Sequence, residues 1–387
     1  MAGKYGFAKF CLSASAAILL TACGGGGEGS NSDNPGQQAG GNHSGGTIVE
    51  GPDSNSQPDS NPQPVPTCSI LTECFDLAQS HVTPYKDFKQ AAASYTFDDG
   101  LPTSPQIASI FEEYGHRATF YINAGLVEEQ EWGQWSELAR NGHEIGNHSW
   151  THAYALGDDA ITDEQLTEQI HRGQIVTEEK IGIRPMGFAF PWHSYNQRAL
   201  DEAYKSHFAV RLREGDMGSD YQFAFFDSEL SRYPDSEAAL SHVNWQLQQA
   251  VNNGGWFVAA GHGIDGDGWS PITSQFLKGH LDHADSFKSR LWVDTHLNVE
   301  RYRQCRRMVE PKVTFQSPSN ASVRLQGNFN AAFCTEPLTL AIPILKAPHA
   351  TLNAFDEAGQ AIAVTNYRDK LLLNIKPGQI VSLRIQH

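Results

Sequence analysis

The sequence predicts an α/β fold, a closed (β/α) barrel of about seven strands, followed by a small all-β domain with a sandwich-like arrangement. From about residue 92 to 308, short apolar runs alternate with helical patterns. After about residue 311 the apolar positions follow period two, and turn signals such as DEAGQ and KPGQ separate the runs. Strands that alternate with helices form parallel sheets, and about seven in series close into a barrel. An open doubly wound sheet is the alternative, although the sequence shows no glycine-rich phosphate loop to suggest it.

Seven apolar runs are expected to form the strands of the parallel sheet. Helical stretches lie between most of them, such as residues 162–180, and Ile107, Ile110 and Phe111 recur at helical spacing. The predicted strands, in chain order, are AAASYTF (91–97), RATFYIN (117–123), HEIGN (143–147), MGFAF (186–190), HFAVRL (207–212), WFVAAG (256–261) and RLWVD (290–294).

Residues 1–23 are predicted to be a lipoprotein signal peptide. Lys4 and Lys9 precede an apolar stretch that is too short to span a bilayer. The run LTAC resembles the lipobox of bacterial lipoproteins, which implies that Cys23 is lipidated. By the same resemblance, Gly24 after the cysteine indicates the outer membrane. We therefore expect an exported protein that is lipid-anchored at the bacterial outer membrane or cell surface; an ordinary cleaved signal peptide is the alternative.

Three further segments follow in the predicted organisation. Residues 24–67 are rich in Gly, Ser, Asn and Pro and are expected to form a disordered tether. Residues 68–310 would hold the barrel, and residues 311–387 a β-rich accessory domain that either binds sugar or packs on the barrel. The formal charge of −16 argues against nucleic acid as a partner and suits a neutral substrate. The oligomeric state stays open.

Export also makes disulfide bonds possible. Cys11 lies in the signal peptide and Cys23 is the expected lipid site, which leaves four cysteines with no C-x-x-C spacing to suggest metal binding. Of the three possible connectivities, the simplest joins neighbours in the chain. The expected structural bridges are therefore Cys68–Cys74 and Cys305–Cys334.

Unusual polar residues follow four of the predicted strands, at the point where each strand ends. These clusters are Asp98 with Asp99, NHSWTH (147–152), PWHSYN (191–196) and HGID (262–265). Parallel α/β barrels place their active sites on the face where the carboxyl ends of the strands meet. We therefore expect the four clusters to converge in space.

Two of the clusters carry metal-ligand chemistry. His148 and His152 are four residues apart, so one helical turn or tight loop would direct both imidazoles to one ion. A carboxylate would complete a three-ligand site with positions open for water and substrate, as in catalytic sites. His280 and His283 are expected in mid-helix, outside the site, and DGDGW at 265–269 lacks the ligand Glu of a calcium loop.

The clusters resemble the motifs of the polysaccharide deacetylases, the family-4 carbohydrate esterases. TFDDG, NHSWTH, FAFPWHSYN and HGI match the family's first, second, third and fifth motifs in order, within about residues 92–300. The resemblance implies a distorted (β/α)7 barrel. It also implies an enzyme that hydrolyses amide C–N bonds, or carboxylic ester bonds, in acetylated glycans.

The resemblance further implies separate roles for the two acids. Asp99, His148 and His152 would bind the divalent metal, usually Zn²⁺. Asp98 would be the general base. Successive residues at a strand end point in different directions, so one carboxylate can bind the ion while its neighbour reaches the attacking water. The charge of the ion would offset the repulsion between the carboxylates, and Gly100 would permit the tight turn that presents them.

The other motifs supply the remaining predicted site residues. His262 would be the acid that protonates the leaving amine or hydroxyl, with a buried core histidine as the alternative interpretation. The backbone N–H of Trp192 would stabilise the oxyanion. Pro191, His193 and Tyr195 are predicted to contact substrate, and His193 stands where the family usually has glycine.

Two family features have no evident counterpart in the sequence. An arginine of the third motif often pairs with the base, but that place holds Ala189, and Arg184 lies too far upstream. Arg211 matches an arginine often seen in its strand region. The acid of the fourth motif, which orients the catalytic histidine, has three unranked candidates: Asp216, Asp227 and Asp235.

The sequence thus favours a metal-dependent hydrolase that removes acetyl groups from an acetylated poly- or oligosaccharide outside the cytoplasm, with an N-acetylglucosamine polymer preferred. Three alternatives stay open. One is an esterase for O-acetylated xylan, and another is an imide or ureide hydrolase on the same barrel. The third is a non-catalytic, anchored glycan-binding lipoprotein that has lost activity with the missing arginine and fourth motif.

Overall fold

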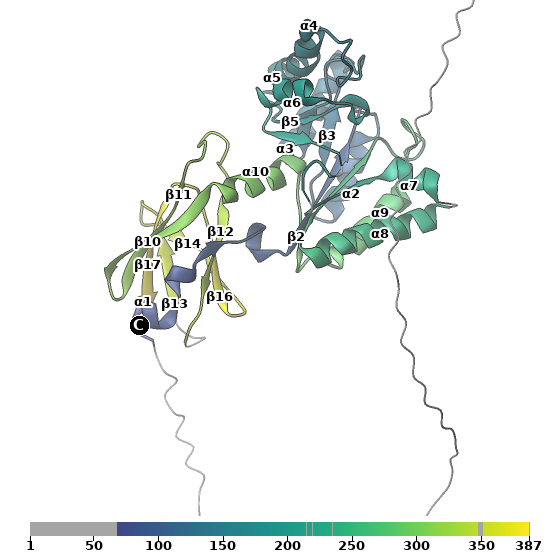
Figure 1. The fold of residues 1–387 in the computed structure, drawn as a ribbon. Helices are drawn as coiled ribbons and strands as arrows, with labels where there is room; N and C mark the ends of the chain where they lie inside the picture. Colours follow the sequence, from purple (N-terminus) through teal and green to yellow (C-terminus); the bar gives the residue numbers. More distant parts are fainter. Residues whose placement is uncertain (1–67, 214, 219, 234, 347–350, 387) are drawn as a thin grey trace, which may run out of the picture. The chain divides into compact units, whose positions relative to one another are not determined.

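The computed structural model describes residues 68–386, apart from residues 214, 219, 234 and 347–350. The predicted signal peptide and tether, with the lipidation site Cys23, lie outside this part of the chain. Within it, a parallel sheet with surrounding helices precedes antiparallel sheets near the C-terminus (Figure 1). None of the described helices is long and apolar enough to cross a membrane.

The parallel sheet has the strand order β6-β5-β4-β3-β2-β8-β7, and β9 pairs beside β2. All of these pairings are parallel, as in a (β/α) barrel. No hydrogen-bonded pairing joins β6 to β7 in the described residues, so the barrel is distorted by an open seam rather than closed. The strands are β2 (Ala91–Phe97), β3 (Thr119–Ile122), β4 (Glu144–Asn147), β5 (Gly187–Ala189), β6 (Ala209–Arg211), β7 (Tyr221–Phe225), β8 (Trp256–Gly261) and β9 (Leu291–Val293).

Seven of these eight strands coincide with the predicted apolar runs, and β7 is the one that the sequence analysis missed. Its five residues, YQFAF, pair in register with β8 along their whole length. The run lies next to loop residues rich in Gly and Asp. The omission matters because the residues after β7 contribute to the site described below.

The helices lie between the strands, as the alternating pattern predicted (Figure 1). The predicted helix at 162–180 begins with a capping box of Thr162 and Gln165, contains one π-helical turn, Glu168–Arg172, and ends at Gly182 in a left-handed conformation. The α-helices are α1 (Leu71–Cys74), α2 (Ser104–Glu113), α3 (Trp132–Arg140), α4 (Asp163–Thr167), α5 (Gly173–Ile181), α6 (Gln197–Tyr204), α7 (Phe226–Arg232), α8 (Ser236–Asn253), α9 (Ser274–Asp285) and α10 (His296–Arg307).

The two faces of β2 differ in chemistry, and this difference positions the site. Ala91, Ala93, Tyr95 and Phe97 alternate along the strand and pack in the main apolar core, which also includes residues of α2, α3, α8 and α9. Thr96 is on the other face, where its hydroxyl donates to the carbonyl of Ala259 at 2.9 Å. At the carboxyl end of β2, this second face therefore presents polar groups to the interior of the barrel.

The C-terminal residues form two antiparallel sheets around a second apolar core, which confirms the predicted sandwich-like domain. The turn signals DEAGQ and KPGQ separate β13 from β14 and β16 from β17. One sheet has the order β1-β12-β16-β15 and the other β10-β11-β17-β13-β14. The strands are β1 (His81–Val82), β10 (Val309–Ser317), β11 (Asn320–Gly327), β12 (Leu338–Pro343), β13 (Thr351–Phe355), β14 (Ala361–Ile362), β15 (Val364–Tyr367), β16 (Lys370–Ile375) and β17 (Ile380–Gln386).

The segment that precedes the barrel belongs to this second core. Strand β1 pairs with β12, and Leu71, Phe75 and Leu77 pack among the buried residues of the sandwich. The predicted limit at residue 68 did not foresee this packing. Both predicted disulfides are present: Cys68–Cys74 lies within the segment, and Cys305–Cys334 joins α10 to the loop before β12. Cys305–Cys334 therefore ties the last helix of the barrel to the sandwich, whereas Cys68–Cys74 constrains the segment before β1.

His280 provides a test of how burial controls stability against acid. It is buried in α9, where its ring contacts the hydroxyl of Tyr95 (3.0 Å) and the side-chain oxygen of Asn244 (2.6 Å). Burial lowers the pKa of His280 from 6.5 to about 3. The unfolded chain therefore binds a proton that the folded chain excludes, so folding stability falls as the pH drops from 6.5 toward 3, by about 1.4 kcal/mol per pH unit.

We predict that His280→Gln loses about 2 kcal/mol less stability than the wild type between pH 7 and pH 5. Urea unfolding at both pH values measures the difference. The variant His81→Gln, at an exposed position, is the control and should retain the wild-type difference. Equal losses in His280→Gln and the wild type would contradict the prediction.

Candidate active site

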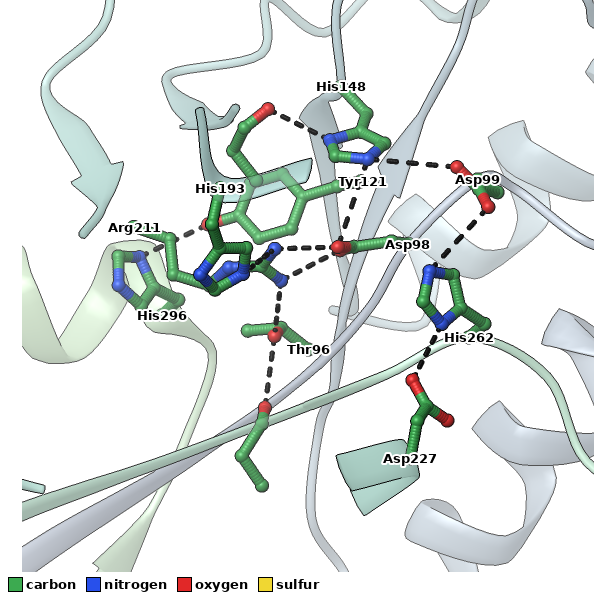
Figure 2. A network of polar contacts seen from close by, with 12 residues as sticks. Thr96, Asp98, Asp99, Tyr121, His148, His193, Arg211, Asp227, His262 and His296 are labelled. Carbon is green, nitrogen blue, oxygen red and sulfur yellow. Dashed lines mark hydrogen bonds and ion pairs between the residues drawn. The ribbon is translucent and has the colours of Figure 1, made fainter. Parts of the chain in front are cut away.

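The four predicted polar clusters meet at the carboxyl ends of the parallel strands (Figure 2). Asp98 and Asp99 follow β2, His148 follows β4, and His262 follows β8. Arg211 is the last residue of β6. Residues far apart in the sequence are brought together because parallel strands end at one edge of the sheet.

Asp99, His148 and His152 form a candidate metal centre. One possible ligand atom from each residue lies within 4.8 Å of the others. The Nε2 atoms of His148 and His152 lie 3.6 and 3.7 Å from the same Asp99 oxygen. Within the residues that the structure describes, this is the only such group of three acidic, histidine or cysteine side chains. Two imidazoles and one carboxylate fit a divalent cation such as Zn²⁺ with positions left open.

A backbone contact and the local backbone conformation position these candidate ligands. His148 Nδ1 lies 2.8 Å from the carbonyl of Ala189, which can only accept, so Nδ1 carries the proton and Nε2 is free to bind an ion. Asp99 (φ 73°) and His152 (φ 55°) occupy the left-handed region, which side-chain-bearing residues rarely adopt. Such strained positions cluster at functional sites.

The side chain of Asp98 lies outside the three-ligand group, because it faces the interior of the barrel. It is 3% exposed and continues the inward face of β2 from Thr96. Its two oxygens accept hydrogen bonds from Arg211, Nη1 to Oδ1 at 2.7 Å and Nη2 to Oδ2 at 2.6 Å (Figure 2). Asp98 Oδ2 also lies 3.8 Å from His148 Nε2. The carboxylate therefore lies beside the metal centre without belonging to it.

The bidentate contact with Arg211 sets the charge of Asp98. Burial acts to raise the pKa of Asp98, but the positive charge of Arg211 and its hydrogen bonds outweigh burial. The pKa of Asp98 is therefore held well below its usual range. Arg211 also donates to the hydroxyl of Thr96 at 2.8 Å, which fixes the guanidinium in the barrel interior. Asp98 stays ionised and oriented, as a proton acceptor requires.

His262 and Asp227 form a second pair on the opposite side of Asp99. His262 Nδ1 lies 2.8 Å from Asp227 Oδ2, and His262 Nε2 lies 3.7 Å from Asp99 Oδ2. Burial lowers the pKa of His262, but the hydrogen bond to Asp227 and the nearby acidic charges raise it above its ordinary value. These contacts stabilise the protonated imidazole, and Nε2 is directed toward Asp99 of the candidate metal centre.

The residues after β5 form the wall next to His152. Pro191 is buried, whereas Trp192 is 59% exposed, and the centroid of its ring lies 4.1 Å from that of His152. Trp192 and His193 both have positive φ, 53° and 51°. The predicted role of the Trp192 N–H in oxyanion binding stays a prediction.

His193 and Tyr195 have contacts that the sequence analysis did not expect. His193 Nε2 accepts from Arg211 Nη2 at 3.0 Å, so its ring supports the Asp98–Arg211 pair. Burial and the Arg211 charge lower the pKa of His193 to about 3, which keeps it a neutral acceptor. The hydroxyl of Tyr195 donates to Asp216 at 2.5 Å and accepts from the Arg213 N–H. Substrate contact by His193 and Tyr195 stays a prediction.

The structure identifies the arginine that pairs with Asp98 and the acid that contacts His262, neither of which could be assigned from the sequence. Arg211 pairs with Asp98 in place of the third-motif arginine, while the carbonyl of Ala189 holds His148. Arg184 instead pairs with Glu178 on the surface. Of the three candidate acids, only Asp227 reaches His262; Asp216 accepts from Tyr195 and Asp235 caps α8. An unrecognised strand, β7, hid the position of Asp227.

The fold and the site together define a class of protein: a (β/α) barrel with a candidate metal centre, a buried carboxylate and a histidine–aspartate pair at its carboxyl edge. Residues 85–210 match the sequence model of the polysaccharide deacetylases. The match agrees with the resemblance to the polysaccharide deacetylases that the motifs predicted. The matched segment contains the acidic pair and both ligand histidines, and it ends before Arg211, Asp227 and His262.

The individual relatives match this chain either at low sequence identity or over a short segment. A gellan lyase from Bacillus sp is 23% identical over 289 residues, 68% of this chain and 11% of that protein. A peptidoglycan-N-acetylglucosamine deacetylase from Bacillus cereus is 35% identical over 98 residues, 24% of this chain and 44% of that protein. The chain spans between 11% and 44% of the length of the curated relatives it matches. The solved structure of the peptidoglycan deacetylase PdaC from Bacillus subtilis is 18% identical, with a TM-score of 0.41, and the match covers 56% of this chain and 94% of that chain.

Proposed function

We propose that the protein is a metal-dependent hydrolase that removes acetyl groups from an acetylated poly- or oligosaccharide outside the cytoplasm, with an N-acetylglucosamine polymer as the favoured substrate. The arrangement around Asp99 carries the proposal. An ionised, buried carboxylate, Asp98, lies on one side of the candidate metal centre, and the His262–Asp227 pair lies on the other. A base and an acid that flank one ion suit the hydrolysis of an acyl bond.

Asp99, His148 and His152 would hold the ion, which we propose to be Zn²⁺. When bound, it would polarise the acetyl carbonyl and lower the pKa of a coordinated water. Asp98 would accept the proton of the attacking water, because Arg211 keeps it ionised and its oxygen lies 3.8 Å from His148 Nε2. His262 would donate a proton from Nε2 to the leaving nitrogen or oxygen, and Asp227 would hold its Nδ1–H.

Two further parts of the proposal concern the rest of the chain. We infer export and lipid attachment at Cys23, with a tether long enough to let the enzyme reach an external glycan. The two disulfides support an oxidising compartment, since such bonds rarely persist in the cytoplasm. The names of the curated deacetylase relatives support a peptidoglycan-type or related N-acetylated substrate.

Removal of the metal should abolish activity. Chelation of the protein with dipicolinate, followed by desalting, is expected to reduce acetate release at least 100-fold, and addition of Zn²⁺ should restore it. Acetate release is measured side by side from N-acetylglucosamine oligomers, peptidoglycan and acetylated xylan. Mass spectrometry of the metal content before and after treatment shows which ion accompanies activity.

The variant Asp99→Ala is the control for specificity of the metal effect, since it removes one of the three ligands. It should bind zinc weakly and remain inactive after zinc addition. Undiminished acetate release by the metal-free wild type would reject the metal-dependent mechanism. Tight glycan binding by the zinc-loaded wild type without any acetate release would favour the anchored glycan-binding alternative.

A further inference from the structure

The loop between β8 and α9 contains the DGDGW run, which the proposed mechanism leaves without a role. Its base is closed by a parallel bridge between Ile264 and Ile272. Asp265 accepts from the Ser274 N–H at 2.8 Å, and Asp267 accepts from the Thr103 N–H at 2.9 Å. Both carboxylates are therefore engaged with the backbone and hold the loop against the start of α2 and α9. We call residues 264–272 the Trp269 loop.

Gly268 shows that this loop has a specific conformation. It has a φ of 82°, which favours glycine, and a Cβ at this position would lie 2.2 Å from the Cδ1 atom of Leu101. A side chain at residue 268 would therefore be strained by this backbone conformation and would have to displace the end of the Leu101 side chain. The close approach and the two aspartate contacts hold the next residue, Trp269, in a defined position.

Trp269 is the most exposed of the large apolar side chains in the described part of the chain, at 64%. The centroid of its ring lies 5.6 Å from that of His262, with an interplanar angle of 82°. On the other side of the centre, the exposed ring of Trp192 lies against His152. Two exposed indoles thus contact two different histidines of the site. An exposed indole adds little to the stability of the fold, because it is not removed from water. A loop that holds the indole in this exposed position therefore points to a ligand that covers it.

We propose that Trp269 is a specificity-determining residue that stacks on the sugar ring bearing the leaving amine or hydroxyl. This inference rests on the proposed function, because it places that ring next to His262, the proposed proton donor. A pyranose presents a face of C–H groups that packs on the negative face of an aromatic ring. Asp99, Asp265 and Asp267 make the surroundings acidic, so the stacked sugar is neutral or, after deacetylation, cationic.

The test compares substrates with and without a sugar ring. In Trp269→Ala, we expect KM for N-acetylglucosamine oligomers to rise about tenfold with kcat within threefold of the wild type. The loss in kcat/KM for 4-nitrophenyl acetate, which has no sugar, should be at least fivefold smaller. Trp269→Phe should recover most of the affinity, since it restores an aromatic face. Trp245→Ala is the matched control, because Trp245 is 53% exposed on α8 and stacks on His242.

A binding measurement separates this inference from the proposed function. Calorimetric titration of N-acetylglucosamine oligomers into zinc-loaded protein requires no turnover. At least tenfold weaker binding by Trp269→Ala than by Trp245→Ala supports the inference, even if the wild type releases no acetate and the proposed function fails. Equal binding by these two variants, or equal losses of kcat/KM on both substrates, overturns the role of Trp269 and leaves the proposed function untouched.

Discussion

Replacement of Asp98 by Asn is expected to lower kcat for acetate release by about 10³-fold while zinc content stays close to that of the wild type. Asn has nearly the shape of Asp and can still accept a hydrogen bond from Arg211, but it cannot take up a proton at neutral pH. The geometry carries this expectation. Asp98 faces the barrel interior and contacts Arg211 with both oxygens, whereas Asp99 belongs to the three-ligand group.

The adjacent variant Asp99→Asn provides the matched comparison. It is expected to lose zinc as well as activity, because its carboxylate is one of three candidate ligands. Steady-state kinetics on N-acetylglucosamine oligomers and zinc per chain by mass spectrometry are measured for both variants. If Asp98→Asn lost its zinc, or kept more than a tenth of the wild-type kcat, Asp98 would not be the base.

Replacement of Arg211 by Met is expected to destabilise the protein by about 3–5 kcal/mol and to lower kcat strongly. The side chains of Arg211 and Asp98 are 0% and 4% exposed, so loss of the guanidinium leaves a buried carboxylate without a partner. Without Arg211, burial would raise the pKa of Asp98, and the base would lose both its charge and its orientation. Urea unfolding of the metal-free protein measures the stability change.

A second substitution and a control distinguish stability from catalysis. The double variant Asp98→Asn with Arg211→Met should be more stable than Arg211→Met alone, because it removes the unpaired charge, yet it should stay inactive. Arg303→Met is the control: Arg303 is equally buried and pairs with Asp220 and Glu300, away from the site. It should lose stability but keep kcat. An equal loss of kcat in Arg303→Met would show that Arg211 acts only through stability.

Much of the fold could be predicted from local patterns. Seven of the eight parallel strands fall within predicted apolar runs of five to seven residues, and period-two alternation marks the sandwich. β7 was missed because its apolar run follows loop residues rich in Gly and Asp. The open seam between β6 and β7 was not predictable either, since pairing depends on strand geometry at the two edges and not on the composition of either strand.

The acidic pair illustrates the division between sequence and structure. The residues of the first two motifs determined the family, the candidate ligands Asp99, His148 and His152, and the separate direction of Asp98, because each depends on a few neighbouring positions. The cysteine spacing likewise indicated both disulfides.

The partners of the catalytic groups were decided only by the tertiary structure. Arg211 lies 113 residues from Asp98, and Asp227 lies 35 residues from His262. No periodicity links such positions, and several arginines and aspartates carry the same chemistry. Only the order of the parallel strands brings the end of β6 opposite β2, so that Arg211 can pair with the buried Asp98. The same order brings the end of β7 beside β8, so that Asp227 can pair with His262. The sequence alone thus determined which residues are candidates to bind the metal and to react, and the packing of the strands decided which residues hold them in their charge states.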